Sequence, residues 1–390
     1  MAWRTAAAAC AVAASGFVLS GLGATASDYK LDARVGQRLQ ADLNRALDPG
    51  GDAGSVTGSL DADVALTTET SRTTLTGEAG ATVRYRQSGD PDLDNEFDFD
   101  PRLGLSATVR GPTTTLVAEG DLTVRRVESS ELEDIGEIDV NSSQITGDAR
   151  FSATERLNER NDLVASFSVR VLDFTRETET LTPTRTFTGT VSWRRDLSAT
   201  TEATARASIR HFIADDLEGE RSQTLDLGFD VSHQRTSRHS MNFGAGVSIL
   251  RTVERNTGVG PDYDVGLTGQ LGFLYELADM RVGFDLTQDI EPSAIGSLQT
   301  FTRLGAQFSQ DVNERERFGA TLAAARRAPV SGPGDTRDTL TISPQYTWRI
   351  NKETDVSVGY SFRLSRDSDE GTATGHMLFF NVGTDFSLFD

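Results

Sequence analysis

The sequence has almost no cysteine or lysine, and no long apolar run beyond its first residues. Its one cysteine, Cys10, excludes a disulfide scaffold and a cysteine-based zinc site. After residue 26 no stretch approaches 18 apolar residues, which excludes helical membrane spans. The chain carries 38 Lys+Arg against 58 Asp+Glu, a net charge of -20, and this balance excludes a nucleic-acid-binding protein. With a mean hydropathy of -0.35, the composition by itself resembles that of a soluble protein.

The first 26 residues have the pattern of a secretory signal peptide. Arg4 supplies a positive charge, an Ala-rich apolar stretch follows, and Ala24 and Ala26 place small residues before Ser27. A membrane anchor is the alternative, but it does not explain the small-residue cleavage site. We therefore expect cleavage after residue 26, which leaves a chain over 27–390 without cysteine, suited to an oxidising periplasm.

The rest of the sequence alternates with a period of two. In Thr73 to Arg86, Ala203 to Arg210 and Val356 to Leu364, every second residue is apolar or small, and the others are mainly charged, Gly, Ser or Thr. Successive side chains of a β-strand point to opposite faces, so this pattern predicts strands with one apolar and one polar face.

Two folds produce such strands, a soluble sandwich and a membrane barrel. The predicted strands run over roughly 10–14 residues, longer than in most globular sheets and long enough to cross a bilayer at a tilt. Their apolar faces are rich in Ala, Val and Gly, which lipid tolerates better than a sandwich core does. Both properties favour an all-β, antiparallel, up-and-down transmembrane β-barrel.

The connections between these strands alternate between short and long. Short turns at one end and longer loops at the other are typical of outer-membrane barrels, whose turns are periplasmic and whose loops are extracellular. Eight turns and nine loops predict 18 strands, with 16 as the alternative. The turns are placed at 70–71, 111–112, 155–161, 195–197, 234–238, 276–279, 310–316 and 351–353, and the loops at 48–54, 87–100, 127–143, 175–184, 213–222, 253–262, 291–297, 328–337 and 367–375.

Two strands fit the pattern less well. The first, Leu31 to Leu47, has leucine and valine at a spacing of four, which also suits an amphipathic helix. An even strand count favours a strand there. Pro344 lies inside a predicted strand, and because proline cannot donate a ladder hydrogen bond, we expect a bulge or a local break at this position.

The C-terminus carries a motif that resembles the β-signal of outer-membrane β-barrel proteins. Asn381, Gly383, Phe386 and Leu388 match that signal, although Asp390 follows the aromatic Phe389. The resemblance implies recognition by the barrel assembly machinery, residence in the Gram-negative cell outer membrane and contact with lipid and lipopolysaccharide. A homo-oligomer is left open.

Aromatic residues fall near the ends of the predicted strands. Such residues favour the two interfaces of a bilayer, so they predict two girdles. The girdle beside the short turns is assigned to Trp193, Tyr275, Tyr346 and Trp348, and the opposite one to Tyr85, Phe174 and Phe212.

The polar faces of the strands are rich in arginine and carboxylates, which we expect to line a lumen. Only Lys30 and Lys352 are lysine, and arginine presents a planar fork of donors that suits carboxylates and anionic solutes. A ladder of Arg–carboxylate pairs that stiffens the wall is an equally good interpretation. The predicted cations are Arg84, Arg102, Arg110, Arg125, Arg170, Arg194, Arg206, Arg210, Arg303, Arg349 and Arg363, and the anions are Glu78, Glu119, Asp121, Asp226, Asp230, Asp285 and Asp355.

No motif predicts catalysis, a metal site or a cofactor. The four histidines belong to no HExxH, and no GxSxG is present. Carboxylates alternate from Asp90 to Asp100, but Asn95 and Arg102 stand where an EF-hand needs Gly and Glu, so a solvated acidic loop is favoured over a Ca²⁺ site.

The favoured function is a porin-like channel for passive passage of small hydrophilic or ionic solutes, because 18 strands leave room for an aqueous lumen. No connection is long enough to predict a loop folded into that lumen. The alternative is a non-enzymatic accessory barrel of an envelope export or surface-assembly system. An outer-membrane hydrolase is a more distant alternative.

Overall fold

The computed structural model describes residues 28–44, 54–88, 96–126, 143–175, 182–214, 221–236, 238–253, 262–292, 298–330, 336–368 and 371–389. These residues form eighteen β-strands and no helix. The strands are β1 (Asp28–Leu43), β2 (Gly54–Glu69), β3 (Thr73–Ser88), β4 (Glu96–Arg110), β5 (Thr114–Arg126), β6 (Ser143–Asn158), β7 (Asn161–Phe174), β8 (Thr184–Ser198), β9 (Thr201–Ala214), β10 (Arg221–Thr236), β11 (His239–Val253), β12 (Asp262–Glu276), β13 (Met280–Pro292), β14 (Leu298–Asp311), β15 (Glu316–Pro329), β16 (Arg337–Arg349), β17 (Thr354–Asp367) and β18 (Gly371–Phe389).

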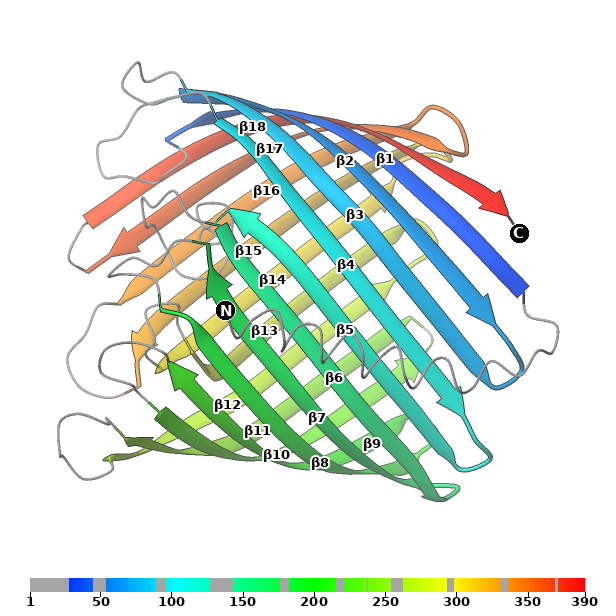
Figure 1. Cartoon of the computed structure of the whole chain (residues 1–390), viewed down its shortest axis with the longest axis vertical. Helices are drawn as coiled ribbons and strands as arrows, with labels where there is room; N and C mark the ends of the chain where they lie inside the picture. The colour runs from blue at the N-terminus through cyan, green and yellow to red at the C-terminus, as the bar shows by residue number, and fades with distance from the viewer. Residues whose placement is uncertain are drawn as a thin grey trace.

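Each strand pairs antiparallel with the next one in the chain, and the last strand pairs with the first, so the sheet closes into a barrel (Figure 1). The closing ladder runs from Asp32, opposite Ser387, to Leu43, opposite His376. A register shift lies between Leu31 and Asp32. The predicted all-β, 18-strand barrel is confirmed, and 16 strands is wrong.

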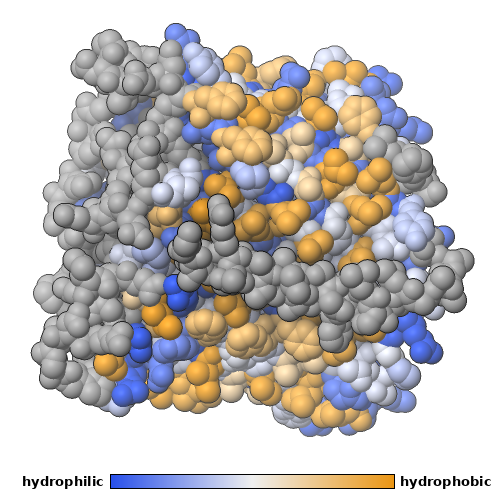
Figure 2. Space-filling view, viewed as in Figure 1, coloured by the Kyte–Doolittle hydropathy of each residue, from blue (hydrophilic) through white to orange (hydrophobic). Residues whose placement is uncertain are grey.

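Alternation along each strand gives the barrel an apolar outside and a polar inside. On β10, the outward Leu225, Leu227 and Phe229 are exposed and alternate with Asp226 and Asp230. Large apolar side chains are exposed in the same way round the ring, and Figure 2 shows them gathered on the visible outer face. The apolar surface of the barrel is therefore on its outside, whereas a soluble domain buries its apolar surface.

The two strands that fitted the pattern less well are both present. β1 is a strand throughout and pairs with β2 from Asp28 to Leu43, so the helical alternative is wrong. Pro344 pairs with Ala320 of β15, but the ladder from β16 to β17 skips from Ile342 to Gln345 and keeps its register. This confirms a local break at the proline rather than a bulge.

The predicted alternation of short and longer connections is confirmed except at the last loop, where β17 and β18 are joined by only three residues, 368–370, instead of the predicted 367–375. Connections of two to four residues (70–72, 111–113, 159–160, 199–200, 237–238, 277–279, 312–315 and 350–353) join β2 to β3, β4 to β5 and so on round the ring. Both chain ends of the barrel, the start of β1 and the end of β18, lie at the end of these turns (Figure 1). The strands span 13 to 19 residues and are longer than predicted, because they extend into segments that were assigned to loops and turns.

One such segment is the acidic run at 87–100. β4 begins at Glu96, so Asp98 and Asp100 lie on the inner face and alternate with the exposed, outward Phe97 and Phe99. The alternation of carboxylates there is partly the period of a strand. Asp90, Asp92 and Asp94 lie outside the described residues, as do the signal peptide (1–26), Leu47, Asp390 and most of the longer loops.

The aromatic prediction is partly wrong. Trp193, Tyr346, Trp348 and Tyr85 are exposed on the outer face as expected. Phe174 and Phe212 are only 6% and 1% exposed, because their positions on β7 and β9 have the inward parity. The loop-side aromatics on the outer face are instead Tyr85, Phe97, Phe99 and Tyr263.

Among the described residues, no helix is long and apolar enough to cross a membrane.

Closure by β1 and β18 predicts a register-specific cross-link. Leu39 and Phe380 are outward partners in this ladder, so cysteines at both positions should form a disulfide in a chain that begins at Ser27 and has no other cysteine. The matched control pairs Leu39→Cys with Thr384→Cys, four residues away in register and roughly 13 Å too far along the strand. Non-reducing electrophoresis measures the cross-link. Equal yields from both pairs would contradict the closure.

Candidate functional site

The inside of the barrel holds all the predicted lumen residues. Each of them has the parity opposite to the exposed apolar residues of its own strand, as Asp226 and Asp230 have opposite to Leu227. The register between strands keeps this parity consistent round the ring. The inner wall is therefore the candidate functional site, and a solute-binding role of its residues stays a prediction.

Many of the predicted lumen residues meet an oppositely charged group on a nearby strand. The nitrogen–oxygen distances are 2.6 Å for Arg84–Asp100, 2.7 Å for Arg170–Asp148, 2.9 Å for Arg303–Glu291, 3.3 Å for Arg194–Glu202, 3.4 Å for Arg363–Asp42 and 4.0 Å for Arg206–Asp230, and Arg102 pairs with Asp63. Such ladders stiffen the wall, although each exposed pair contributes only ~0–1 kcal/mol. The interpretation as a reinforcing ladder is well supported by this geometry.

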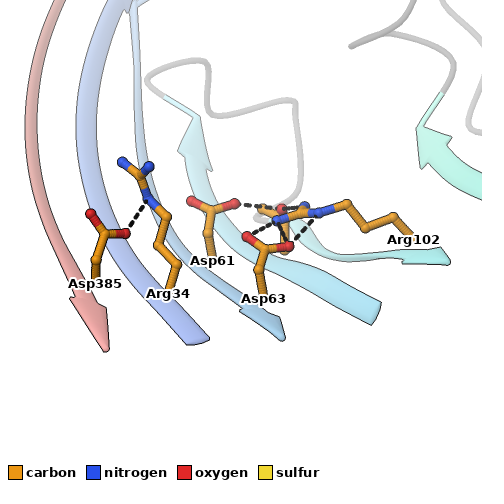
Figure 3. A network of polar contacts seen from close by, with 6 residues as sticks. Arg34, Asp61, Asp63, Arg102 and Asp385 are labelled. Atoms are coloured by element: carbon orange, nitrogen blue, oxygen red, sulfur yellow. Dashed lines mark hydrogen bonds and ion pairs between the residues drawn. The ribbon is translucent and has the colours of Figure 1, made fainter. Parts of the chain in front are cut away.

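Polar contacts on the inner side of the wall join β1 to β18, and others link the nearby strands β2, β3 and β4. Figure 3 shows Arg34 of β1 beside Asp385 of β18, at 3.7 Å. Farther along, Arg102 of β4 forms a bidentate pair with Asp63 of β2 and donates to the Thr82 hydroxyl at 3.1 Å. Thr82 in turn donates to Asp61 at 2.5 Å. One ion pair thus bridges the seam where the first and last strands meet, and a separate group of polar contacts links the nearby strands β2, β3 and β4.

Nearer the loops, the same seam buries charge. The side chain of Asp42 is fully buried and meets Arg363, itself mostly buried, at 3.4 Å. Beside them the Arg38 guanidinium stacks 4.6 Å from the centre of the Phe379 ring. The Nε atoms of Arg38 and Arg363 are buried without a hydrogen-bond partner among the described residues. These two buried N–H groups lie on the inner side of the barrel. An oxygen atom of a solute that reached them would accept their hydrogen bonds.

Another part of the ring, at β12 to β14, contains an inward-folded hairpin. In the described residues, the ladder between β12 and β13 runs only from Gly269, opposite Gln288, to the turn. β13 nevertheless stays paired with β14 as far as Pro292, opposite Leu298. The loop-side end of the β13–β14 hairpin has therefore separated from β12. We call the described residues of this end, 289–292 and 298–303, the hairpin tip.

Contacts of Ile290 place the hairpin tip on the inner side of the wall. Its side chain is 1% exposed and packs against Leu250, an inward residue of β11, with Val330 beside it. A Cβ on the inward Gly266 of β12 would lie 2.5 Å from Ile290 Cδ1. The carbonyl oxygen of Ile290 accepts a hydrogen bond from Arg210 of β9. The prediction concerned long loops, and what lies on the inner side here is instead the end of a strand, β13.

Two arginines flank an aromatic ring on the hairpin tip. Phe301 is 5% exposed, with Arg303 Cζ 3.9 Å and Arg327 Cζ 4.6 Å from its ring centre. Arg303 also pairs with Glu291 through both guanidinium ends, at 2.9 and 3.3 Å. Stacking and pairing hold the guanidiniums in place, which fixes a basic wall beside the tip.

An acidic wall stands across the barrel from this basic one. Glu78, Asp121 and Asp148 follow one another across β3 to β6, with Gly104 between the first two. β5 lies nine positions from β14 in the ring of eighteen, and so on the opposite side. Asp148 at the end of this row pairs with Arg170, at 2.7 Å. Carboxylates facing arginines across a narrowed lumen create a transverse electric field.

Some features were not predicted. The partners Asp42, Asp63, Asp100 and Glu291 share the inward parity and could have been found by extending the alternation. Ile290 has the outward parity of its strand, so the alternation gave no indication that its side chain packs on the inner side of the wall. Among the described residues no group of three or more His, Cys, Asp or Glu could hold a metal ion.

The residues of the β-signal motif lie on the closing strand, β18. Phe386 is exposed outside, and Asn381 faces inward, with its Nδ2 3.3 Å from Ser357 Oγ. A Cβ on Gly383 would lie 3.2 Å from Asp355 and 3.3 Å from Arg34. Leu388 is also within β18. Recognition of these residues by an assembly machinery stays a prediction.

No protein-family model and no curated protein matches the chain. Among solved structures it is similar to OccAB3 of Acinetobacter baumannii, with 13% identity, a TM-score of 0.49 and coverage of 92% of this chain and 100% of the other. It is similar to OccK7 (OpdD) of Pseudomonas aeruginosa, with 11% identity, a TM-score of 0.48 and coverage of 93% and 100%. For the outer membrane protein opdK of Pseudomonas aeruginosa the values are 10%, 0.49, 91% and 99%. Such low identities identify no solute.

The contact between Gly266 and Ile290 predicts a rescue. Gly266→Ala should lower the free energy of unfolding by about 1–3 kcal/mol, because the added Cβ collides with Ile290 Cδ1. Adding Ile290→Val removes that atom and should recover most of the loss. Gly319→Ala is the control, since its Cβ would meet nothing closer than 3.8 Å. Chemical denaturation measures five proteins: wild type, Gly266→Ala, Ile290→Val, the double variant and Gly319→Ala. Additive effects of the two substitutions would contradict the packing of the hairpin tip on β12.

Proposed function

We propose that this chain is an outer-membrane channel for the passive, non-enzymatic passage of small hydrophilic or ionic solutes. The observation that carries the proposal is the closed ring of eighteen strands with apolar side chains outside and charged ones inside. Barrels of 16–18 strands enclose an aqueous lumen when side chains do not fill it.

The outer surface supports a membrane location. Exposed Leu60, Leu105, Phe167, Leu227 and Leu267 belong to a band of large apolar side chains that follows the ring. Water would penalise a band of this extent, whereas hydrocarbon solvates it. Closure also leaves no unpaired sheet edge, which is the condition for a β-structure to span a bilayer.

The connections support an orientation with the short turns in the periplasm and the longer loops outside. The connection 89–95 contains three acidic residues, the connection 127–142 contains six, and neither contains a basic residue. Solutes approaching from outside would meet an anionic mouth. Export through residues 1–26 and assembly through Asn381, Gly383, Phe386 and Leu388 complete the proposal.

The hairpin tip is the selective part of the proposed channel. Arg303 on the tip and Arg327 beside it on β15 lie across the ring from the acidic wall of β3 to β6, so a solute would pass between fixed charges of opposite sign. The charged side chains on both sides must stay solvated, either by water or by a polar or ionic solute that replaces it. An apolar solute would leave them unsolvated, so this arrangement favours polar and ionic solutes.

Charged thiol reagents test whether the hairpin tip lines the conducting path. Wild-type protein in planar bilayers should give discrete conductance steps. In a chain that begins at Ser27, Glu291→Cys should respond to methanethiosulfonates, and cationic and anionic reagents should shift the ion selectivity in opposite directions. Leu227→Cys, on the outer face of β10, is the control and should not respond. A wild type without conductance steps would contradict the channel. Equal responses of the two cysteine variants to the reagents would also contradict it.

The depth of a charge on the outer face tests the membrane location. Leu227→Arg lies midway along β10 and should lower the free energy of unfolding from phospholipid vesicles by about 2–4 kcal/mol. Leu197→Arg lies beside the turn at 199–200, where the same charge should cost about 0–1 kcal/mol. Denaturant titration in vesicles gives both values. Similar losses at the two depths would count against a bilayer around the barrel.

A further inference from the structure

Four basic side chains interrupt the apolar outer face at the loop-side ends of β8 to β11. They are Arg185, His211, Arg221 and Arg251, which we call the outer basic cluster. On their own strands they share the parity of exposed apolar residues: Arg185 that of Val191, His211 that of Ile209, Arg221 that of Leu225 and Arg251 that of Ile249. They therefore point away from the lumen.

The register brings these four side chains together. Gln223 of β10 pairs with His211 on one side and with Arg251 on the other. One pleat nearer the loops, Ile213 pairs with both Arg185 and Arg221. With neighbouring strands about 4.8 Å apart and alternate residues about 7 Å apart, the cluster covers a patch on the order of 15 Å across.

The hydrogen-bonding capacity of the patch exceeds what the described residues supply. Arg251 Nε and His211 Nδ1 are buried and have no hydrogen-bond partner among them. Arg251 Nη1 makes only a long contact of 3.5 Å, to Gln223 Oε1. The outward carboxylate of Asp173 on β7 lies two residues from Val171, the register partner of Arg185, and it accepts a hydrogen bond from the Phe174 amide. The patch is thus basic and rich in donors.

The surroundings of the cluster indicate a lipid rather than a free anion. The residues directly below it on the same face are Ile209, Leu225 and Ile249, all exposed, which would contact acyl chains. Tyr263, in register with Arg251, is exposed at its flank, and tyrosine favours the boundary between hydrocarbon and headgroups. Guanidinium forks match phosphate oxygens in geometry and charge.

We propose that the outer basic cluster binds the phosphate groups of lipid headgroups in the loop-side leaflet. The inference rests on the proposed function, since it needs the barrel to span a membrane with this face toward lipid. In a Gram-negative outer membrane the corresponding lipid would be phosphorylated lipid A. The cluster would then seat one lipid against β8 to β11.

Native mass spectrometry of the whole barrel in detergent tests this with purified bisphosphorylated lipid A. The double variant Arg221→Gln/Arg251→Gln should bind lipid A at least tenfold more weakly than wild type. Arg326→Gln is the matched control: it also lies at the loop-side end of the outer face, but it pairs with Asp338 at 3.8 Å, and its removal should leave binding unchanged. Lipid A stripped of phosphate should bind wild type as weakly as it binds the double variant.

Equal binding of lipid A by wild type and the double variant overturns the proposal. Competition by millimolar inorganic phosphate as strong as that by lipid A also overturns it, because the patch would then be a general anion site. Heat-modified electrophoretic mobility checks that every variant is folded. Conductance in phosphatidylcholine bilayers separates the two proposals: a wild type that does not insert contradicts the channel, whereas insertion without any lipid A preference contradicts only the cluster.

Discussion

Backbone hydrogen bonding between β1 and β18 is the contact on which the other features depend. In hydrocarbon an unpaired N–H or carbonyl costs several kcal/mol, so a sheet with a free edge cannot remain there. Joining residues 31–43 to 376–389 removes both edges at once. Closure then gives every strand an inside and an outside, and the period of two in the sequence becomes a difference between lumen and lipid. The ion pair between Arg34 of β1 and Asp385 of β18 reinforces that same seam from within.

The inner wall combines stiffness with a narrowing. Around most of the ring, arginines are tied to carboxylates on adjacent strands, so their charges are fixed in position without a folded core. The hairpin tip uses the same device, since Phe301 and Glu291 hold Arg303 in place. What differs is the backbone of β13, which separates from β12 beyond Gln288 and carries Glu291 with it. A wall of fixed charges therefore needs no long loop to become selective.

Most of the fold was accessible from the sequence because lipid imposes a strict alternation. That rule placed eighteen strands, and the parity of Asp226 or Arg303, correctly. It failed where parity conflicts with a residue's chemistry: Phe174 and Phe212 were assigned to a girdle as aromatics, although their positions face inward. It also could not predict the packing of Ile290. This residue has the outward parity of its strand, but the end of that strand has separated from β12. Tertiary displacement of a backbone leaves no trace in a pattern of single residues, and the glycine that permits it, Gly266, resembles any other small residue on a polar face.

The separation of β12 from β13 also changes how the barrel would fail. Between 262 and 268, β12 has β11 on one side only, and the side-chain amide of Gln288 reaches the Leu267 carbonyl at 2.9 Å where a backbone partner would otherwise stand. One amide replaces several rungs of ladder, so the work needed to part the sheet is smallest along this line. Under heat or lateral tension we expect the barrel to open first along this line, which lies six strands from the β1–β18 seam in the ring of eighteen.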